Sequence, residues 1–122
     1  MGFNPITLLR ISYKNNQMAK ELKSVRYDVD LSRKYTGDEM HKIIEDISKK
    51  LNVCISHIGS YSRKKYPNSI HWHFKENPKE VGCLDATFWE EGNAFWIVAR
   101  NREPQWVKDK AKQMQLELGK MV

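Results

Sequence analysis

The sequence predicts an α+β fold, a two-layer sandwich in which an antiparallel β-meander of four to five strands packs against two amphipathic helices. Two segments place apolar residues at helical spacing, and four to five short segments alternate apolar and polar residues. Residues typical of turns separate most of these short segments. Because two amphipathic helices need an apolar sheet face to cover, we expect two layers in the order β-α-β-β-β-β-α.

Length and composition favour one ordered domain. The chain has 122 residues, of which 40% are hydrophobic, and it contains four Trp, five Tyr and four Phe. We assign residues 18–122 to a single α+β domain and residues 1–17 to an N-terminal segment, either a strand or a poorly ordered leader. The apolar run at residues 6–13 contains Arg10 and is too short to span a bilayer, so we expect a cytoplasmic protein with no membrane partner.

The first half of the domain begins with a strand and a helix. Residues 25–31 alternate, with Val25, Tyr27 and Val29 on one side, which predicts a half-buried strand. Thr36 and Glu39 have the spacing of a capping box and predict a helix over residues 37–51. The apolar stripe of this helix comprises Met40, Ile43, Ile44, Ile47 and Leu51.

The second half predicts four strands and a closing helix. The strands are expected at residues 53–61, 69–75, 83–89 and 94–100. The last helix should open near Pro104 and end near Gly119. Its apolar stripe comprises Val107, Ala111, Met114 and Leu118.

Side-chain alternation divides the strand residues between two faces. Ile70, Trp72 and Phe74 should point toward the helices. With Gly92-Asn93 as a two-residue turn, Asp85 would lie opposite Arg100. A turn of four residues would change this pairing but leave each side chain on the same face of the sheet. The side chains expected on the second face are His71, His73, Asp85, Thr87, Trp89, Trp96 and Arg100.

This second face has two interpretations. An open surface of indole and imidazole rings could stack on a base, a sugar or another planar ligand. Alternatively, the N-terminal segment or a second subunit covers it, because two exposed Trp side chains would form an apolar patch typical of interfaces. Self-association through this face is therefore an alternative to ligand binding.

Two histidines at i and i+2 form a weak metal-binding pattern. His71 and His73 lie about 7 Å apart along one side of a strand, and Asp85 or His57 could be a third ligand. An isolated His-x-His in a Trp-rich strand more often reflects cross-strand packing. We therefore expect no metal and no cofactor from the sequence, with His71 and His73 as the weak candidates.

A basic loop is the main candidate for nucleic-acid contact. The net charge is +6, and Arg63, Lys64, Lys65 and Tyr66 follow one another, with Lys75 further along the chain. Lysine and arginine neutralise phosphates, and tyrosine can stack on a base. The alternative is a solvated loop whose charge only keeps the protein soluble.

No sequence motif indicates an enzyme. The chain lacks GxSxG, P-loop, GxGxxG and HExxH motifs, and strand alternation places Cys54 and His57 on opposite faces. The sequence therefore favours a small non-enzymatic binding domain with nucleic acid as its leading ligand. A homo-oligomeric subunit is the first alternative, and an enzyme that depends on a metal or a small molecule is the second.

Overall fold

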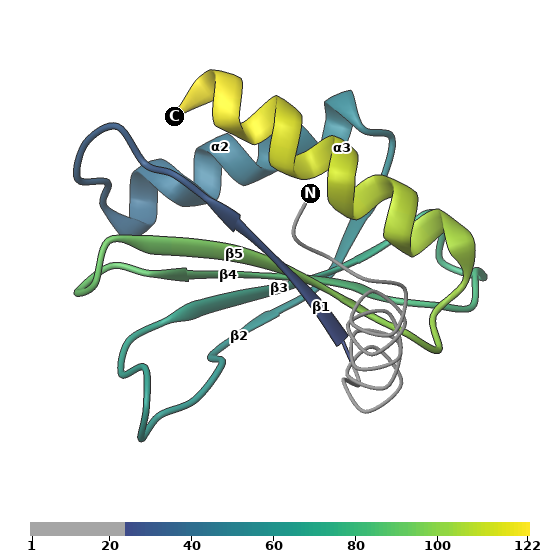
Figure 1. The fold of residues 1–122 in the computed structure, drawn as a ribbon, viewed down its shortest axis with the longest axis horizontal. Helices are drawn as coiled ribbons and strands as arrows, with labels where there is room; N and C mark the ends of the chain where they lie inside the picture. The colour runs from purple at the N-terminus through teal and green to yellow at the C-terminus, as the bar shows by residue number, and fades with distance from the viewer. Residues whose placement is uncertain (1–23) are drawn as a thin grey trace, which may run out of the picture.

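The computed structural model describes residues 24–122, which form one five-stranded antiparallel sheet and two helices (Figure 1). The predicted α+β fold and its element order are confirmed. The prediction for residues 1–17 lies outside the described residues. In chain order the elements are β1 (Ser24–Val29), α2 (Gly37–Lys50), β2 (Cys54–Gly59), β3 (Ile70–Lys75), β4 (Leu84–Trp89), β5 (Ala94–Arg100) and α3 (Gln105–Met121).

The sheet has the strand order β1-β5-β4-β3-β2. Strands β2 to β5 form a meander, and β1 joins it at the free side of β5, with Tyr27 opposite Ile97. Strands β3, β4 and β5 therefore have hydrogen-bonded neighbours on both sides. Side chains carried by these inner strands are held by a more rigid backbone than those on the edges.

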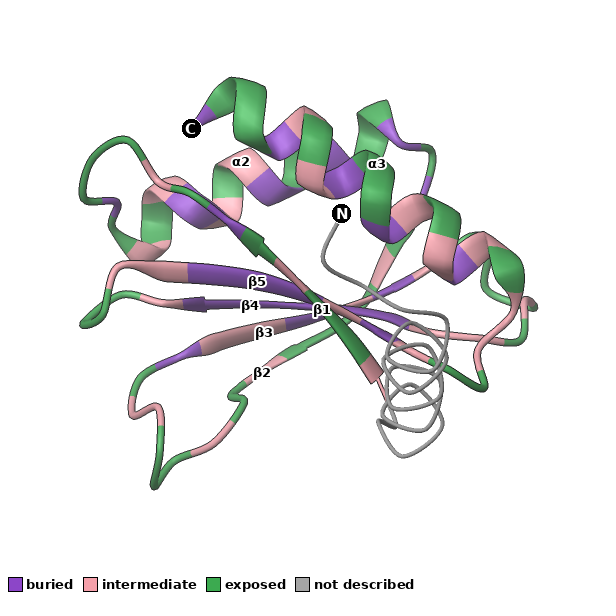
Figure 2. Ribbon diagram, viewed as in Figure 1, coloured by how far each residue is buried: buried purple, intermediate pink, exposed green. Residues whose placement is uncertain are grey.

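Both helices cover the same face of the sheet (Figure 1). Helix α2 opens with the predicted capping box, in which the Thr36 side chain accepts from the Glu39 amide and the Glu39 carboxylate accepts from the Thr36 amide. Figure 2 shows the buried side of each helix turned toward the sheet. The fully buried side chains include Met40, Ile44, Ile47, Trp72, Phe74, Leu84, Phe88, Ile97, Val107, Met114 and Leu118.

The predicted pairing of the β4–β5 hairpin is wrong by two residues, although its faces are correct. Asp85 lies opposite Val98 instead of Arg100, because four residues rather than two connect the strands. Asn93 closes this turn with a positive φ of 46°. Its side chain accepts from the Tyr35 amide and donates to the Arg33 carbonyl, so contacts with the β1–α2 connection select the longer turn.

Among residues 24–122, neither helix is long and apolar enough to cross a membrane.

Candidate functional site on the outer face

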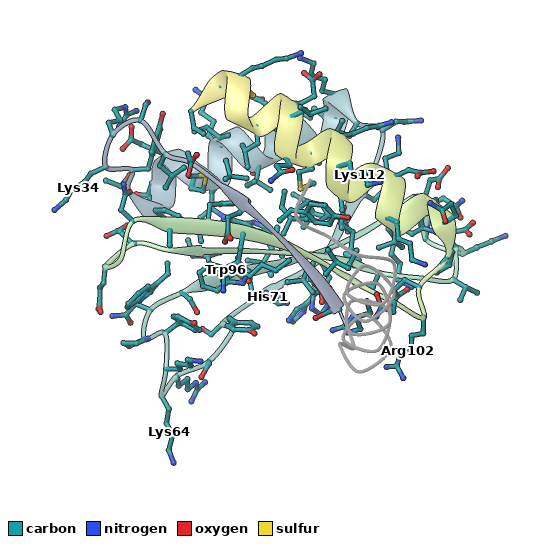
Figure 3. The ribbon with its side chains drawn as sticks, viewed as in Figure 1. Lys34, Lys64, His71, Trp96, Arg102 and Lys112 are labelled. Atoms are coloured by element: carbon teal, nitrogen blue, oxygen red, sulfur yellow. The ribbon has the colours of Figure 1, made fainter. Side chains whose placement is uncertain are left out.

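The candidate site is the sheet face turned away from α2 and α3, called here the outer face. Alternation places His71 and His73 of β3 on it, and cross-strand pairing sets Thr87 beside His71 and Asp85 beside His73. Trp96 of β5 follows beside Thr87. Figure 3 shows His71 and Trp96 near the middle of this face. The predicted division of side chains between the two faces is therefore observed at these positions.

Asp85 is the centre of a polar cluster on the outer face. Asp85 is only 2% exposed. One of its carboxylate oxygens, Oδ2, accepts a hydrogen bond from Arg100 Nη2 at 2.8 Å. The other oxygen (Oδ1) lies 3.2 Å from Cys83 Sγ and 3.6 Å from His73 Nε2. Because Asp85 lies opposite Val98, Arg100 is two residues further along β5 and reaches the carboxylate diagonally. The buried negative charge of Asp85 is thus balanced by the Arg100 guanidinium, which contacts the Oδ2 oxygen.

Three imidazoles lie in a row across β2 and β3. The ring centroids of His71 and His73 are 4.7 Å apart, and those of His73 and His57 are 5.3 Å apart. His57 reaches this row because β2 pairs with β3 so that His57 lies opposite His73. Burial, which disfavours the charged form, lowers the pKa of His71. Burial of the His71 ring therefore favours its uncharged form.

Cys83 belongs to the cluster but is poorly suited to nucleophilic chemistry. Burial raises the pKa of its thiol to about 12, and the hydrogen bond to the Asp85 carboxylate acts in the same direction. Because the thiolate is the reactive form, the Cys83 thiol stays protonated and unreactive at neutral pH. Sequence reasoning did not select Cys83, although alternation over residues 83–89 places it on the same face as Asp85, two residues away.

Aromatic side chains from the β2–β3 connection cover the other half of the outer face. The Tyr66 ring lies 4.9 Å from Trp96 and 5.1 Å from Trp89, and the Tyr61 ring lies 5.7 Å from Trp96. The Arg26 guanidinium is 4.4 Å from the centroid of the Trp96 ring. Trp96 is consequently only 2% exposed and offers no free ring face for stacking.

Tyr61 is more exposed than Tyr66, the other aromatic side chain that the loop contributes to this cover. It is 48% exposed, and its ring also lies 5.5 Å from His71 and 5.6 Å from Tyr66. The ring is therefore held in place by its neighbours while part of it stays accessible. Sequence reasoning did not select Tyr61, although its position five residues before Tyr66 in a basic segment was a usable signal.

The basic loop forms a closed, outward-pointing turn. The Tyr66 amide donates to the Ser62 carbonyl at 3.0 Å, and the Lys65 amide donates to Ser62 Oγ at 3.2 Å. Arg63, Lys64 and Lys65 are exposed at its tip. None of the three forms an ion pair with a carboxylate of residues 24–122.

The structure does not bring all predicted basic residues together. Lys75 is at the opposite end of β3 from the loop, about 16 Å away for a six-residue strand, and its ammonium donates to the Glu80 carbonyl. Figure 3 shows Lys64 at the tip of the loop and Lys112 on the helical side of the molecule. Of the predicted basic residues, only Arg63, Lys64 and Lys65 therefore lie together, at the tip of the loop.

No protein-family model, no curated protein and no solved structure matches the chain. The candidate functions therefore rest on the chemistry of the outer face and its basic loop.

Proposed function

We propose that the protein is a small binding domain for single-stranded nucleic acid, held through the basic loop and the neighbouring Tyr61 ring. The observation that carries this proposal is the loop tip, where Arg63, Lys64 and Lys65 are exposed and unpaired with any carboxylate of residues 24–122. Three cations within one short turn match consecutive phosphates of a flexible strand.

The position of Tyr61 favours a nucleic acid over an acidic protein partner. Its half-exposed ring precedes the cationic tip directly in the chain and is supported from below by Trp96 and Tyr66. A supported aromatic ring beside cations can stack on a base while the cations hold the phosphates. A base can reach this ring only if it is unpaired, which favours single-stranded segments over a duplex.

The surroundings of Trp89 and Trp96 favour the binding proposal over self-association. Self-association through the outer face supposes two exposed Trp side chains that need a partner to cover them. Trp96 is already buried within the chain, and Tyr66 packs against both Trp89 and Trp96. The proposal therefore assigns Trp96 and Trp89 to the support of the loop rather than to an interface between subunits.

A salt titration tests the electrostatic part of the proposal. We expect fluorescein-labelled (dT)20 and (rU)20 to bind at 50 mM NaCl, with affinity falling roughly 20-fold by 200 mM NaCl for about three phosphate contacts. Replacing Arg63, Lys64 and Lys65 together by Ala should abolish most of this salt dependence. Absence of binding to both oligonucleotides at 50 mM NaCl would overturn the proposal.

A matched variant separates a local site from net charge. Replacing Lys34, Lys42 and Lys112 by Ala removes the same three charges from exposed positions outside the basic loop. We expect this control to keep the affinity and the salt slope within about twofold. An equal loss in both triple variants would show that only the overall charge matters.

The stacking part of the proposal has its own readout. Tyr61→Leu should weaken binding by roughly 5- to 100-fold, as expected for the loss of one base–aromatic contact. The slope of affinity against salt should stay unchanged, because Leu removes no charge. An unchanged affinity would exclude Tyr61 as a contact residue.

A further inference from the structure

Two imidazoles and one buried carboxylate converge on the outer face. The ligand atoms that His71, His73 and Asp85 can offer all lie within 4.8 Å of one another. We propose that these three side chains bind one divalent transition-metal ion of the Zn²⁺ class. This proposal does not depend on nucleic-acid binding, and its test uses no nucleic acid.

The backbone places the three ligands in advance. His71 and His73 come from β3, and Asp85 lies directly opposite His73 on β4. Both strands are inner strands of the sheet, each hydrogen-bonded on its two sides. A site on rigid strands loses little conformational freedom when an ion binds, which is the requirement for a preorganised metal site.

Thr87 orients one of the two imidazoles. His71 Nδ1 lies 2.7 Å from Thr87 Oγ1, and Thr87 is only 1% exposed. When Nδ1 carries the proton and donates to this oxygen, Nε2 presents its lone pair. Metal-binding histidines commonly use one nitrogen for the ion and the other for such a hydrogen bond.

The two oxygens of the Asp85 carboxylate differ in their hydrogen-bond donors: Oδ2 has a strong donor and Oδ1 has a weak one. Oδ2 is held by Arg100 at 2.8 Å, whereas within residues 24–122 Oδ1 has only the weak thiol donor of Cys83 at 3.2 Å. His73 Nε2 lies 3.6 Å from Oδ1, which is beyond normal hydrogen-bond distance. A buried carboxylate oxygen without a strong donor is costly, and a cation bound to Oδ1 would remove that cost.

The donor set indicates the class of ion. Two imidazole nitrogens and one carboxylate oxygen suit Zn²⁺ and similar first-row divalent ions, whereas Mg²⁺ prefers oxygen ligands alone. Tetrahedral bonds of about 2.1 Å place donors about 3.4 Å apart, so binding requires side-chain movements of about 1 Å. Arg100 occupies Oδ2 and thereby restricts Asp85 to one coordinating oxygen.

Calorimetry on the full chain without an affinity tag, first treated with EDTA, tests the site. We expect ZnCl₂ to bind with one ion per chain and MgCl₂ not to bind. At free Zn²⁺ about 100 times the Kd, the Tm should rise by roughly 10 °C. Absence of saturable Zn²⁺ binding would overturn the proposal.

Single substitutions identify the ligands. His71→Ala, His73→Gln and Asp85→Asn should each weaken Zn²⁺ binding at least tenfold, and the two histidine variants keep the test valid if Asp85→Asn does not fold. His41→Gln is the matched control, because His41 packs against Trp72 on the helical side of the sheet. We expect this control to bind Zn²⁺ like the wild type.

His57 provides the sharpest discrimination. Its exposed ring flanks His73 on the side away from Asp85, so a surface ion could bind to His57 and His73 instead. In the proposed site, His57→Gln leaves one ion bound with unchanged stoichiometry. Loss of Zn²⁺ in His57→Gln together with retention in Asp85→Asn would overturn the assignment.

Discussion

Removal of the Arg100 charge should destabilise the protein through the buried Asp85 carboxylate. The two side chains pair at 2.8 Å, with Asp85 3% and Arg100 37% exposed. Breaking a buried ion pair from one side costs about 3–5 kcal/mol. Because water can reach the vacated Arg100 position, we expect Arg100→Met to lower the free energy of unfolding by about 2–3 kcal/mol.

A second substitution tests the origin of this cost. If the loss comes from an uncompensated buried charge, neutralising the carboxylate should restore part of the stability. We therefore expect the double variant Asp85→Asn/Arg100→Met to be more stable than Arg100→Met by at least about 1 kcal/mol. A simple loss of contacts predicts the opposite order, because the double variant lacks more of them.

Urea denaturation at pH 7 measures both quantities. With an m-value of about 1–1.5 kcal/mol/M, Arg100→Met should lower the midpoint by about 2 M urea. Arg102→Met is the control, because Arg102 is exposed and forms no ion pair with the other described residues. Its effect should stay within about 0.5 kcal/mol. A loss below 1 kcal/mol for Arg100→Met, or a double variant less stable than the single one, would refute the reasoning.

Two further predictions concern the turn and the helix start. Asn93→Ala should lower the free energy of unfolding by about 2 kcal/mol, because it removes two hydrogen bonds and places Ala at positive φ. Asn93→Gly should lower it by only about 1 kcal/mol, because Gly tolerates this conformation. Thermal unfolding of both variants checks this order, and equal losses would contradict it. The hydrogen bond from Arg33, with that from the N-cap backbone, lowers the pKa of Glu39 to about 2 from 4.5. A lowered folded-state pKa means that ionised Glu39 stabilises the protein fully above about pH 4.5 and that this contribution is lost as the pH falls toward 2. The Tm difference between the wild type and Glu39→Gln should therefore be constant from pH 7 to about 5.5 and shrink below pH 4.5; a difference independent of pH would exclude this linkage.

Several features of the fold could be predicted because they depend on local sequence. The capping box of Thr36 and Glu39 involves residues three apart, and it forms as predicted. The burial of Trp72 and Phe74 follows from alternation along a single strand. Such patterns need no knowledge of the rest of the chain.

The candidate site could be predicted only in part. The positions of His71 and His73 on one face follow from their spacing along β3, but the approach of Asp85 from β4 depends on strand register. The register prediction failed because Asn93 binds the distant Tyr35 amide and Arg33 carbonyl. A contact across about sixty residues of sequence leaves no local signal.

The packing of Tyr61 and Tyr66 over Trp96 is a second feature that the sequence could not predict. Alternation places this indole on the outer face, but the sequence alone left open whether it forms a stacking surface or is covered by the N-terminal segment or a second subunit. The loop folds back so that Tyr66 and Tyr61 pack against it, and Tyr61 is the more exposed of these two rings. Loop conformation depends on closure contacts such as the Tyr66 amide to the Ser62 carbonyl, which periodicity does not reveal.

By itself the sequence determined the α+β class, the order of the elements and the side-chain directions in β3, β4 and β5, because the Cα–Cβ bond direction follows from local backbone geometry. The prediction that Cys54 and His57 lie on opposite faces is wrong, because a register shift between Ile55 and His57 pairs them with Lys75 and His73, which share one face of β3. Only the tertiary structure decided which of those side chains meet and which stay accessible. Strand register, loop closure and the pairing of Asp85 with Arg100 all arise from contacts between residues distant in the chain. Those contacts bring polar side chains such as His71, His73 and Asp85 close enough together to form a candidate binding site.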